Sequence, residues 1–489
     1  MRTTLLEAVR STLENNVNVK VQERQVQFAQ GALEGASGQF DPALGSSIDL
    51  SRARTPLTAA QQAQGPLTTL DSDVATYSMQ LSQQLRNGAV IGASVSGTRS
   101  LDNVSRLSGV PAQNLGRIDL SLLLPLGKGS GSAASAVEAA SSKELEATRA
   151  DLTHSLAQNV LTTITAYWGL VAARQNLEIA RQGETGVGRL RQELQKLVAA
   201  DERPAADLTL LSANVADKVA QRLSAERVVL DAQQALGRSM GLPYSRYSAL
   251  EPVDGFPNRP RDLSLLPSET SRLTEYALRR RPDVVAADLR RAASQTLADA
   301  ARQNLKPQID LKLHVGYAGL HEGNTVAAAW PFGGQVAGPS GGATLIYQWS
   351  FGNRSAQGAL VQQLALVEQS DLRIADLRNA VGAGVETALA GASSSARQLL
   401  QSVDSLALYR RAVENEKMKN RLGQSTLIEV LSVNDLLLAA LAADIAYQAN
   451  YLTSVARLRF ETATLLEPSG NGQTIRLDQL LSVPTVPKE

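Results

Sequence analysis

The chain has 489 residues, with 48 basic and 47 acidic side chains and a formal net charge of +1. Because acids and bases are interspersed, no basic face for nucleic acid or for a membrane surface is expected. The chain has no cysteine, which excludes disulfides, thiolate metal sites and cysteine nucleophiles.

Aromatic residues are scarce, at 4% of the chain, while Ala, Leu, Gln, Arg and Glu are abundant. This composition is typical of long helices packed closely side by side. The first residues, MRTTLLEAVRSTLENN, contain acids and no apolar core, so they are not a signal peptide. We expect that any export signal lies outside this numbering. No window approaches 18 consecutive apolar residues, so a membrane span would have to consist of strands.

The first half predicts a helix over residues 1–42, then strands and loops over 43–125. Within the latter, Asn87-Gly88 separates two alternating runs in residues 74–98. This is the strongest short hairpin signal in the chain. The apolar face of this hairpin would be Ala75, Tyr77, Met79, Leu81, Leu85, Ala89, Ile91, Ala93 and Val95.

Residues 126–242 predict a long helix, a turn and a return helix. The stretch from 130 to about 198 lacks proline and keeps apolar residues at helical spacing. As one continuous helix of roughly 68 residues it would span about 100 Å. No compact domain accommodates that length, so a coiled-coil rod or tube is expected.

The second half repeats this plan. A shift of 265 residues places Val19 on Val284 and Pro42 on Pro307, which indicates an internal duplication. Residues 243–268 are expected to be a linker, and residues 269–307 a helix. Residues 308–351 predict strands with an outer loop. Residues 352–466 predict a long helix with its turn and return helix, and residues 467–489 an irregular tail.

The strand-like runs of the second half place apolar residues on one face. These are Ile309, Leu311, Leu313 and Val315 in the first run and Leu345, Tyr347, Trp349 and Phe351 in the second. An ordinary antiparallel sheet with one wet face is one interpretation. Run lengths of about 9 to 12 residues, aromatic residues near the run ends and Gly/Ser-rich connectors (52–73, 99–115, 319–341) favour lipid-facing strands of a β-barrel. One chain has too few strands to close a wide barrel, so several copies are expected.

Two motifs carry a family resemblance. Residues 279–317 (RRRPDVVAADLRRAASQTLADAARQNLKPQIDLKLHVGY) and 421–466 (RLGQSTLIEVLSVNDLLLAALAADIAYQANYLTSVARLRFETATLL) resemble the TolC-like outer membrane efflux protein family. The resemblance extends to about residue 467. It implies an α+β membrane protein that forms a homotrimer, with a shared outer-membrane β-barrel continued by a long periplasmic α-helical barrel.

The resemblance also implies function and partners. The protein would be an exit duct rather than an enzyme, without a cofactor, located in the outer membrane and extending into the periplasm. It would work with a periplasmic adaptor (membrane fusion) protein and an inner-membrane RND or ABC pump. The family has four strands per chain, whereas this sequence has six strand-like runs, so a trimer would have either twelve or eighteen strands.

The resemblance also assigns residues at the inner tip. Glu429 matches an acidic position of the pore constriction, Asp207 is its counterpart, and Ser432 stands where a second acid often occurs. A ring of carboxylates would select cations; alternatively, both acids favour the dipole of their own helix. The turns expected to contact the adaptor contain Asp201, Arg203, Pro204, Arg421, Gly423 and Gln424. Asp201 replaces the glycine of the second turn, and Asp tolerates the left-handed conformation.

Two other functions remain open at this stage. One is a soluble, elongated coiled-coil scaffold, and the other is a passive porin, which the long helices disfavour. His154 lies in a predicted helix and is interpreted as a packed or solvated residue. His314 and His321 lack acidic partners at ligand spacing, so they make a weak metal site. The sequence does not distinguish a drug, metal, polysaccharide or protein as the transported substrate.

Overall fold

The computed structural model describes residues 1–63, 65–201, 204–257, 270–323, 336–469, 472–474 and 482–484. The chain divides into two compact units. The helical unit comprises Met1–Gln27, Glu146–Asp288 and Leu372–Glu489. The sheet unit comprises Phe28–Leu145 and Leu289–Asp371. Each unit therefore combines segments from both halves of the sequence.

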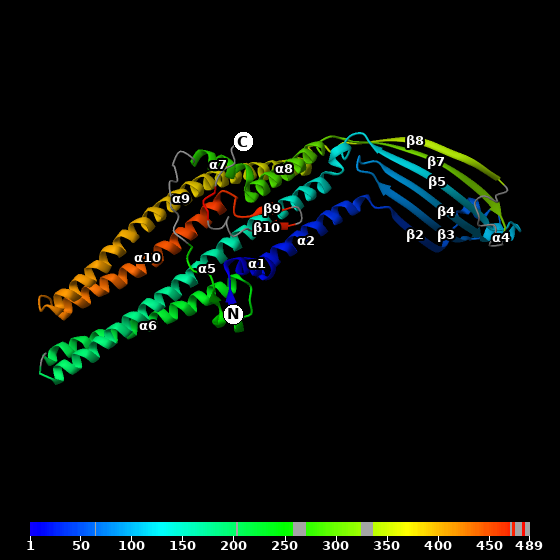
Figure 1. Cartoon of the computed structure of the whole chain (residues 1–489). Helices are drawn as coiled ribbons and strands as arrows, with labels where there is room; N and C mark the ends of the chain where they lie inside the picture. Colours follow the sequence, from blue (N-terminus) through cyan, green and yellow to red (C-terminus); the bar gives the residue numbers. More distant parts are fainter. Residues whose placement is uncertain are drawn as a thin grey trace. The chain divides into compact units, whose positions relative to one another are not determined.

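The long helices form two matched series (Figure 1). The first half contains α1 (Leu5–Asn15), α2 (Val17–Ser37), α5 (Ala136–Ala199) and α6 (Ala205–Ser239). The second contains α7 (Thr270–Arg280), α8 (Pro282–Gln303), α9 (Arg354–Arg421) and α10 (Leu427–Glu461). Their lengths are 11, 21, 64 and 35 residues against 11, 22, 68 and 35. The expected long helices are thus confirmed, and their lengths repeat as the duplication predicts.

Short elements connect these helices. They are β1 (Arg2–Thr3), the 3-10 turn Gly38–Phe40, α3 (Ala59–Gln62), α4 (Asn103–Leu107), the 3-10 turns Gly131–Ala133 and Tyr244–Ala249, β6 (Glu251–Pro252), β9 (Glu467–Ser469) and β10 (Gly472–Thr474). The parallel pair β1–β6 joins the chain start to the segment after α6. Most of the predicted tail, and the linker from residue 258 to 269, lie outside the described residues. No described helix is long and apolar enough to cross a membrane.

The main core of the helical unit lies where α1, α5, α6, α9 and α10 meet. Tyr167 and Trp168 are buried in it, with ring centroids 5.4 Å apart in an edge contact. The Tyr167 hydroxyl donates to Asp254 at 2.9 Å, and Asp254 accepts from the backbone N–H of Leu5 at 2.7 Å. These two hydrogen bonds to Asp254 hold the start of α1 against α5. Burial is the main cause that raises the pKa of Tyr167, so its hydroxyl stays protonated and donates.

A buried ionic network lies beside this core. Arg281 donates to Asp283 at 2.8 Å and pairs with Glu461, whose side chain is 5% exposed. Burial acts to raise the pKa of Asp283, but the hydrogen bonds and charge of Arg281 outweigh it and lower that pKa. The network holds the beginning of α8 against the end of α10.

His154 lies 3.8 Å from Asp283, and its ring centroid lies 5.4 Å from that of Phe460. Burial lowers the pKa of His154; Asp283 opposes this effect, and Arg281 adds to it. We therefore place His154 as a packed, neutral residue.

The lowered pKa of His154 predicts a pH effect on stability. Below the unfolded value of about 6.5, the unfolded chain binds a proton that the folded chain does not. The free energy of unfolding therefore falls as the pH decreases from about 6.5 to the folded pKa. In His154→Gln, we expect a smaller loss between about pH 7 and pH 5, measured by urea unfolding. An unchanged loss would contradict this role.

The sheet unit contains one antiparallel six-stranded sheet with the order β2-β3-β4-β5-β7-β8. Its strands are β2 (Ala43–Pro56), β3 (Thr69–Gln84), β4 (Val90–Asp102), β5 (Gln113–Pro125), β7 (Gln308–Glu322) and β8 (Val336–Gln348). They have 13 to 16 residues, more than the expected 9 to 12. The expectation of loops over 52–73, 99–115 and 319–341 was wrong at their ends. The ladders continue there through polar residues and glycines that the apolar alternation does not mark.

The predicted hairpin is confirmed and lies within the sheet, as β3 and β4 between β2 and β5. Its turn has Gly88 at φ 90, and Leu85 N–H donates to Ala89 O at 2.7 Å. Asn87 does not have a positive φ, so the turn is a three-residue loop that ends in a glycine bulge, not a two-residue I′ turn. A Cβ at Gly88 would lie 2.4 Å from the carbonyl oxygen of Gly129, so this position requires glycine.

One part of the strand prediction was wrong. β8 ends at Gln348, which pairs with Gln308, the first residue of β7. Trp349 and Phe351 follow the strand and have no residue of β7 opposite them, so they are not strand residues. Phe351 is 96% exposed.

Candidate functional site

Two parts of the molecule carry the predicted functional residues: the sheet, and the turns that join α5 to α6 and α9 to α10. In the sheet, residues paired across strands share a face, and successive residues alternate between faces. The ladders place on one face the residues Leu44, Ile48, Leu50, Ala75, Tyr77, Met79, Leu81, Ile91, Ala93, Val95, Ile118, Leu120, Leu122, Leu124, Ile309, Leu311, Leu313, Val315, Tyr317, Ala343, Leu345 and Tyr347. We call this set the apolar band.

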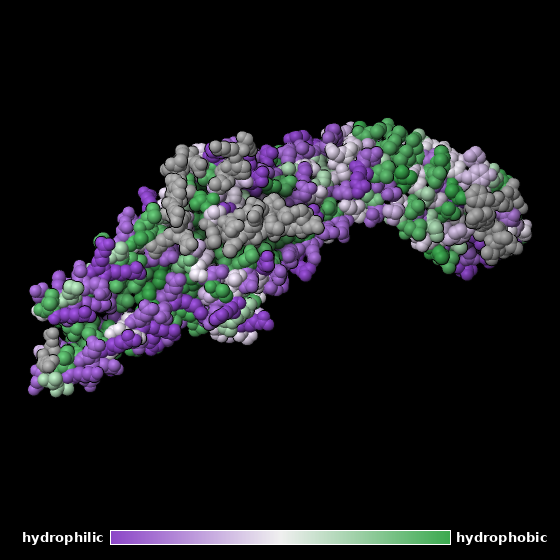
Figure 2. Space-filling view, viewed as in Figure 1, coloured by the Kyte–Doolittle hydropathy of each residue, from purple (hydrophilic) through white to green (hydrophobic). Residues whose placement is uncertain are grey.

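The apolar band is exposed on the isolated chain. Ile48 is 80% exposed, Leu345 65% and Tyr347 66%. Figure 2 shows hydrophobic residues gathered over the strands. Soluble monomers rarely expose a contiguous apolar surface of this extent, so such a surface marks contact with a membrane or with another protein.

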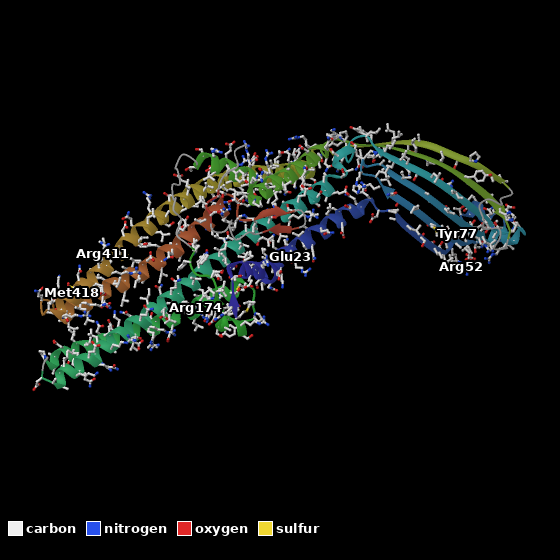
Figure 3. All side chains as sticks on the ribbon, in the orientation of Figure 1. Glu23, Arg52, Tyr77, Arg174, Arg411 and Met418 are labelled. Carbon is white, nitrogen blue, oxygen red and sulfur yellow. The ribbon has the colours of Figure 1, made fainter. Side chains whose placement is uncertain are left out.

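The band ends in charge toward the loops. Arg52 and Arg54 of β2 follow Leu50 on the same face, and they pair with Asp73 at 3.3 Å and Asp71 at 2.6 Å. Tyr77 belongs to the band and Arg52 to this charged border (both labelled in Figure 3). An apolar zone bounded by paired charges matches the change from hydrocarbon to a polar interface.

The opposite face of the sheet is mostly polar. In β3 and β4 it carries Thr76, Ser78, Gln80, Ser82, Ser94, Ser96, Thr98 and Ser100. In β5 and β7 it includes Arg117, Asp119, Lys312 and His314. This alternation of apolar and polar faces is expected for strands between lipid and water. Among the described residues, no group of His, Cys, Asp and Glu is arranged to hold a metal ion.

The second helical turn ends α9 with a glycine cap. Gly423 has φ 73, its N–H donates to Asn420 O, and the Gln424 N–H donates to Lys419 O at 2.9 Å. This is the Schellman arrangement, which satisfies the last carbonyls of a helix. Arg411 and Met418, labelled in Figure 3, mark the last turns of α9 before this cap.

The first turn adopts the same backbone conformation without glycine. Asp201 has φ 60, so the expectation that Asp serves in the left-handed position is confirmed. Pro204 is the N-cap residue of α6, and its carbonyl accepts from Asp207 N–H at 3.1 Å. Arg203 lies outside the described residues.

Glu429 caps its own helix. Its carboxylate accepts from the Thr426 N–H at 2.6 Å and lies 2.9 Å from the Ser425 hydroxyl, while its N–H donates to the Thr426 hydroxyl. The backbone hydrogen bond from Thr426 is the main cause that lowers the pKa of Glu429. The carboxylate is therefore fixed and charged at neutral pH. Glu429 thus lies in the first turn of α10, as the dipole interpretation requires, and its role in the pore constriction stays a prediction.

Ser425 also contacts Glu416 near the end of α9. One hydroxyl has one proton, so it can donate to only one of the two carboxylates at a time. Asp207 occupies the first turn of α6, as Glu429 does in α10, and is half-buried. Ser432 and Arg421 are exposed.

A contact between α6 and α10, which sequence reasoning missed, holds the two helical hairpins together. The ammonium of Lys218, whose side chain is 8% exposed, lies 2.7 Å from Asp435. Nearby, Leu431 packs with Val187, Leu194 and Leu211. The only sequence signal was a lysine and an aspartate on helices whose packing register was unknown.

Comparisons with known proteins agree with this architecture. Residues 273–463 match the sequence profile of the family described as outer membrane efflux protein. No curated protein matches the chain. Among solved structures, the outer-membrane channel OprN is similar with a TM-score of 0.69 at 16% identity, covering 94% of this chain and 90% of that one.

Two further outer-membrane proteins have the same fold. The CmeC outer membrane channel of Campylobacter jejuni has a TM-score of 0.68 at 16% identity, covering 94% of this chain and 85% of that one. The outer membrane protein VceC of Vibrio cholerae has 0.67 at 15% identity, covering 94% and 95%. The matched family and structures are channels rather than enzymes. The predicted resemblance is thus confirmed: the chain has the fold of outer-membrane channels, and its residues 273–463 match the outer membrane efflux protein family.

Proposed function

We propose that this protein is an exit duct in the outer membrane, gated at its periplasmic tip. Three copies would form it, and substrates would reach it from an inner-membrane RND or ABC pump through a periplasmic adaptor protein. The observation that carries this proposal is the apolar band, which crosses all six strands on one face while the other face is mostly polar. An open sheet cannot face lipid with unpaired edges, so the band requires closure by further copies.

The helical hairpins would form the periplasmic tip of the duct. In a trimer, Asp207 and Glu429 would place six carboxylates around the inner aperture, and a ring of this kind attracts cations. Lys218–Asp435 and the cluster around Leu431 would hold the two hairpins of each copy together. The residues proposed for adaptor contact are Asp201, Arg203, Pro204, Arg421, Gly423 and Gln424.

Planar-bilayer recordings test the duct and the ring together. We expect channels with a preference for cations in the wild type, and a reduced preference in Glu429→Gln, because that change removes charge. Glutamine can still accept the Thr426 N–H, as in a capping box, so the helix start is retained. Glu429→Ala removes the charge and the carboxylate half of the capping box, while Thr426 still accepts from the backbone N–H of residue 429.

The two variants separate the roles of Glu429. If the carboxylate lines the pore, both variants change ion selectivity alike, and only Glu429→Ala lowers stability. Equal selectivity in wild type, Glu429→Gln and Glu429→Ala would remove Glu429 from the aperture. Absence of conductance in all three, with protein inserted in the bilayer, would contradict the duct itself.

A further inference from the structure

We propose that the hairpin β3–β4 is part of the membrane wall, and that three copies close an eighteen-stranded barrel in which Leu345 of one copy lies opposite Ile48 of the next. This inference rests on the proposed function. It extends that function because four strands per chain, as the resemblance implies, would give a barrel of twelve strands.

The position of the hairpin in the sheet is the first argument. β3 and β4 lie between β2 and β5, with full ladders on both sides. Excluding the hairpin from the wall would break two ladders and expose their backbone groups, at a cost of several kcal/mol per unsatisfied group in lipid. Both faces of the hairpin also fit the wall, since one bears the apolar band and the other bears hydroxyls and amides.

The apolar band also slants across the hydrogen-bonded rows. The row through Leu50 and Ala75 is apolar in β2 and β3 but becomes polar in β4, β5 and β7, where it contains Arg99, Asn114 and His321. A row nearer the helices shows the reverse. It has Gln83 in β3 and then Ile91, Leu122, Leu313 and Ala343.

The slant has a measurable size. One continuous row joins Leu44, at the helix end of the β2 band, with Gly341, which lies six residues before Tyr347, at the helix end of the β8 band. The band therefore moves by about its own height, about six residues, across the six strands. With a rise of about 3.3 Å per residue and strands about 4.8 Å apart, this corresponds to a tilt of roughly 40°. Membrane barrels require strands tilted by about 35–45°.

All six strands share the slant of the apolar band. A single membrane plane therefore fits the band only if all six strands belong to one wall. If β3 and β4 stood outside the barrel, their exposed apolar residues would have no reason to lie on the line between those of β2 and β5. Tyr77 and Val95 nevertheless lie in that line.

The edges of the sheet then determine the junction. Because each strand is antiparallel to its neighbour, the edge strands β2 and β8 run in opposite directions. β8 of one copy can therefore pair antiparallel with β2 of the next. Continuing the same slant by one strand places the centre of the β8 band, Leu345, opposite Ile48. These two residues are 65% and 80% exposed on the single chain.

An eighteen-stranded barrel would be about one and a half times as wide as one of twelve strands, since diameter grows roughly linearly with strand number. Barrels of 16–18 strands leave an aqueous channel. The polar face of β3 and β4, rich in serine and threonine, would form about a third of its lining. The outer opening would then admit larger solutes than a twelve-stranded duct does.

Disulfide mapping in membranes tests the wall, because the chain has no cysteine of its own. Ile48→Cys with Leu345→Cys should give covalent dimers and trimers on oxidation, and Leu44→Cys with Leu345→Cys, displaced by four residues, should not. Within one copy, Leu44→Cys with Leu81→Cys should cross-link. Leu44→Cys with Leu120→Cys should not, since β3 and β4 separate those strands.

The outcomes separate this inference from the proposed function. Cross-linking of the Leu44 and Leu120 positions in a variant that conducts ions would show that β2 pairs with β5. The duct would stand and the eighteen-stranded wall would be overturned. Absence of any cross-link between copies, together with absence of conductance, would overturn both. Cross-linking of the displaced pair in place of the Ile48 and Leu345 pair would refute the proposed junction.

Discussion

Replacing Arg281 by methionine should lower the free energy of unfolding of the helical unit by about 3–5 kcal/mol, the usual cost of breaking a buried ion pair. The guanidinium pairs with Asp283 and Glu461, and only 9% of its side chain is exposed. Methionine keeps about the length of the side chain but removes the cation that pairs with the carboxylates of Asp283 and Glu461. Arg457 still lies 2.6 Å from Glu461, which places the loss nearer the lower end of this range.

Arg279→Met is the matched control for this prediction. Arg279 lies two residues earlier and pairs with Glu275 at 2.6 Å, but the two side chains are 65% and 66% exposed. Exposed pairs contribute less than about 1 kcal/mol. Urea unfolding followed by circular dichroism compares the two variants. Equal losses would mean that burial does not govern the strength of this network.

Gly241→Ala should destabilise the same unit by about 2–4 kcal/mol. Gly241 ends α6 at φ 68 with a Schellman cap, in which Leu242 N–H donates to Gly237 O. The left-handed conformation costs alanine about 1 kcal/mol. A Cβ there would also lie 2.3 Å from the carbonyl oxygen of Asn15, so the end of α1 would have to move, which adds about 1–3 kcal/mol.

Gly423→Ala isolates the packing part of that loss. Gly423 has nearly the same φ, 73, but a Cβ there meets no described atom within 4 Å. We expect a loss of about 1 kcal/mol from the conformation alone. If the two alanine variants lost equal free energy of unfolding, the contact between α1 and α6 would be able to rearrange without loss of stability.

Much of the fold could be predicted because it follows from local patterns. The absence of proline and the helical spacing of apolar residues predicted α5 and α9, and the shift between the halves predicted that their partners would match. Asp201 was expected in a left-handed turn from its alignment with Gly423, and it adopts that conformation. Asn87-Gly88 located the hairpin, although its loop is one residue longer than the two-residue type.

The rest depends on contacts between distant residues. Arg281 and Glu461 are 180 positions apart, and their pairing depends on where α8 meets α10. Lys218 and Asp435 likewise meet only because α6 packs against α10. The apolar alternation extended past Gln348 to Phe351, but the strand ends where β7 provides no further partner. The slant of the band appears only when the registers of all six strands are known.

Electron microscopy of the protein extracted from membranes in detergent shows whether copies of this chain form a duct in the outer membrane. We expect a threefold particle with a detergent belt around the strands and a helical tube projecting from it. A monomeric or dimeric particle that stays in solution without detergent and carries no belt would exclude the duct and favour a soluble coiled-coil scaffold.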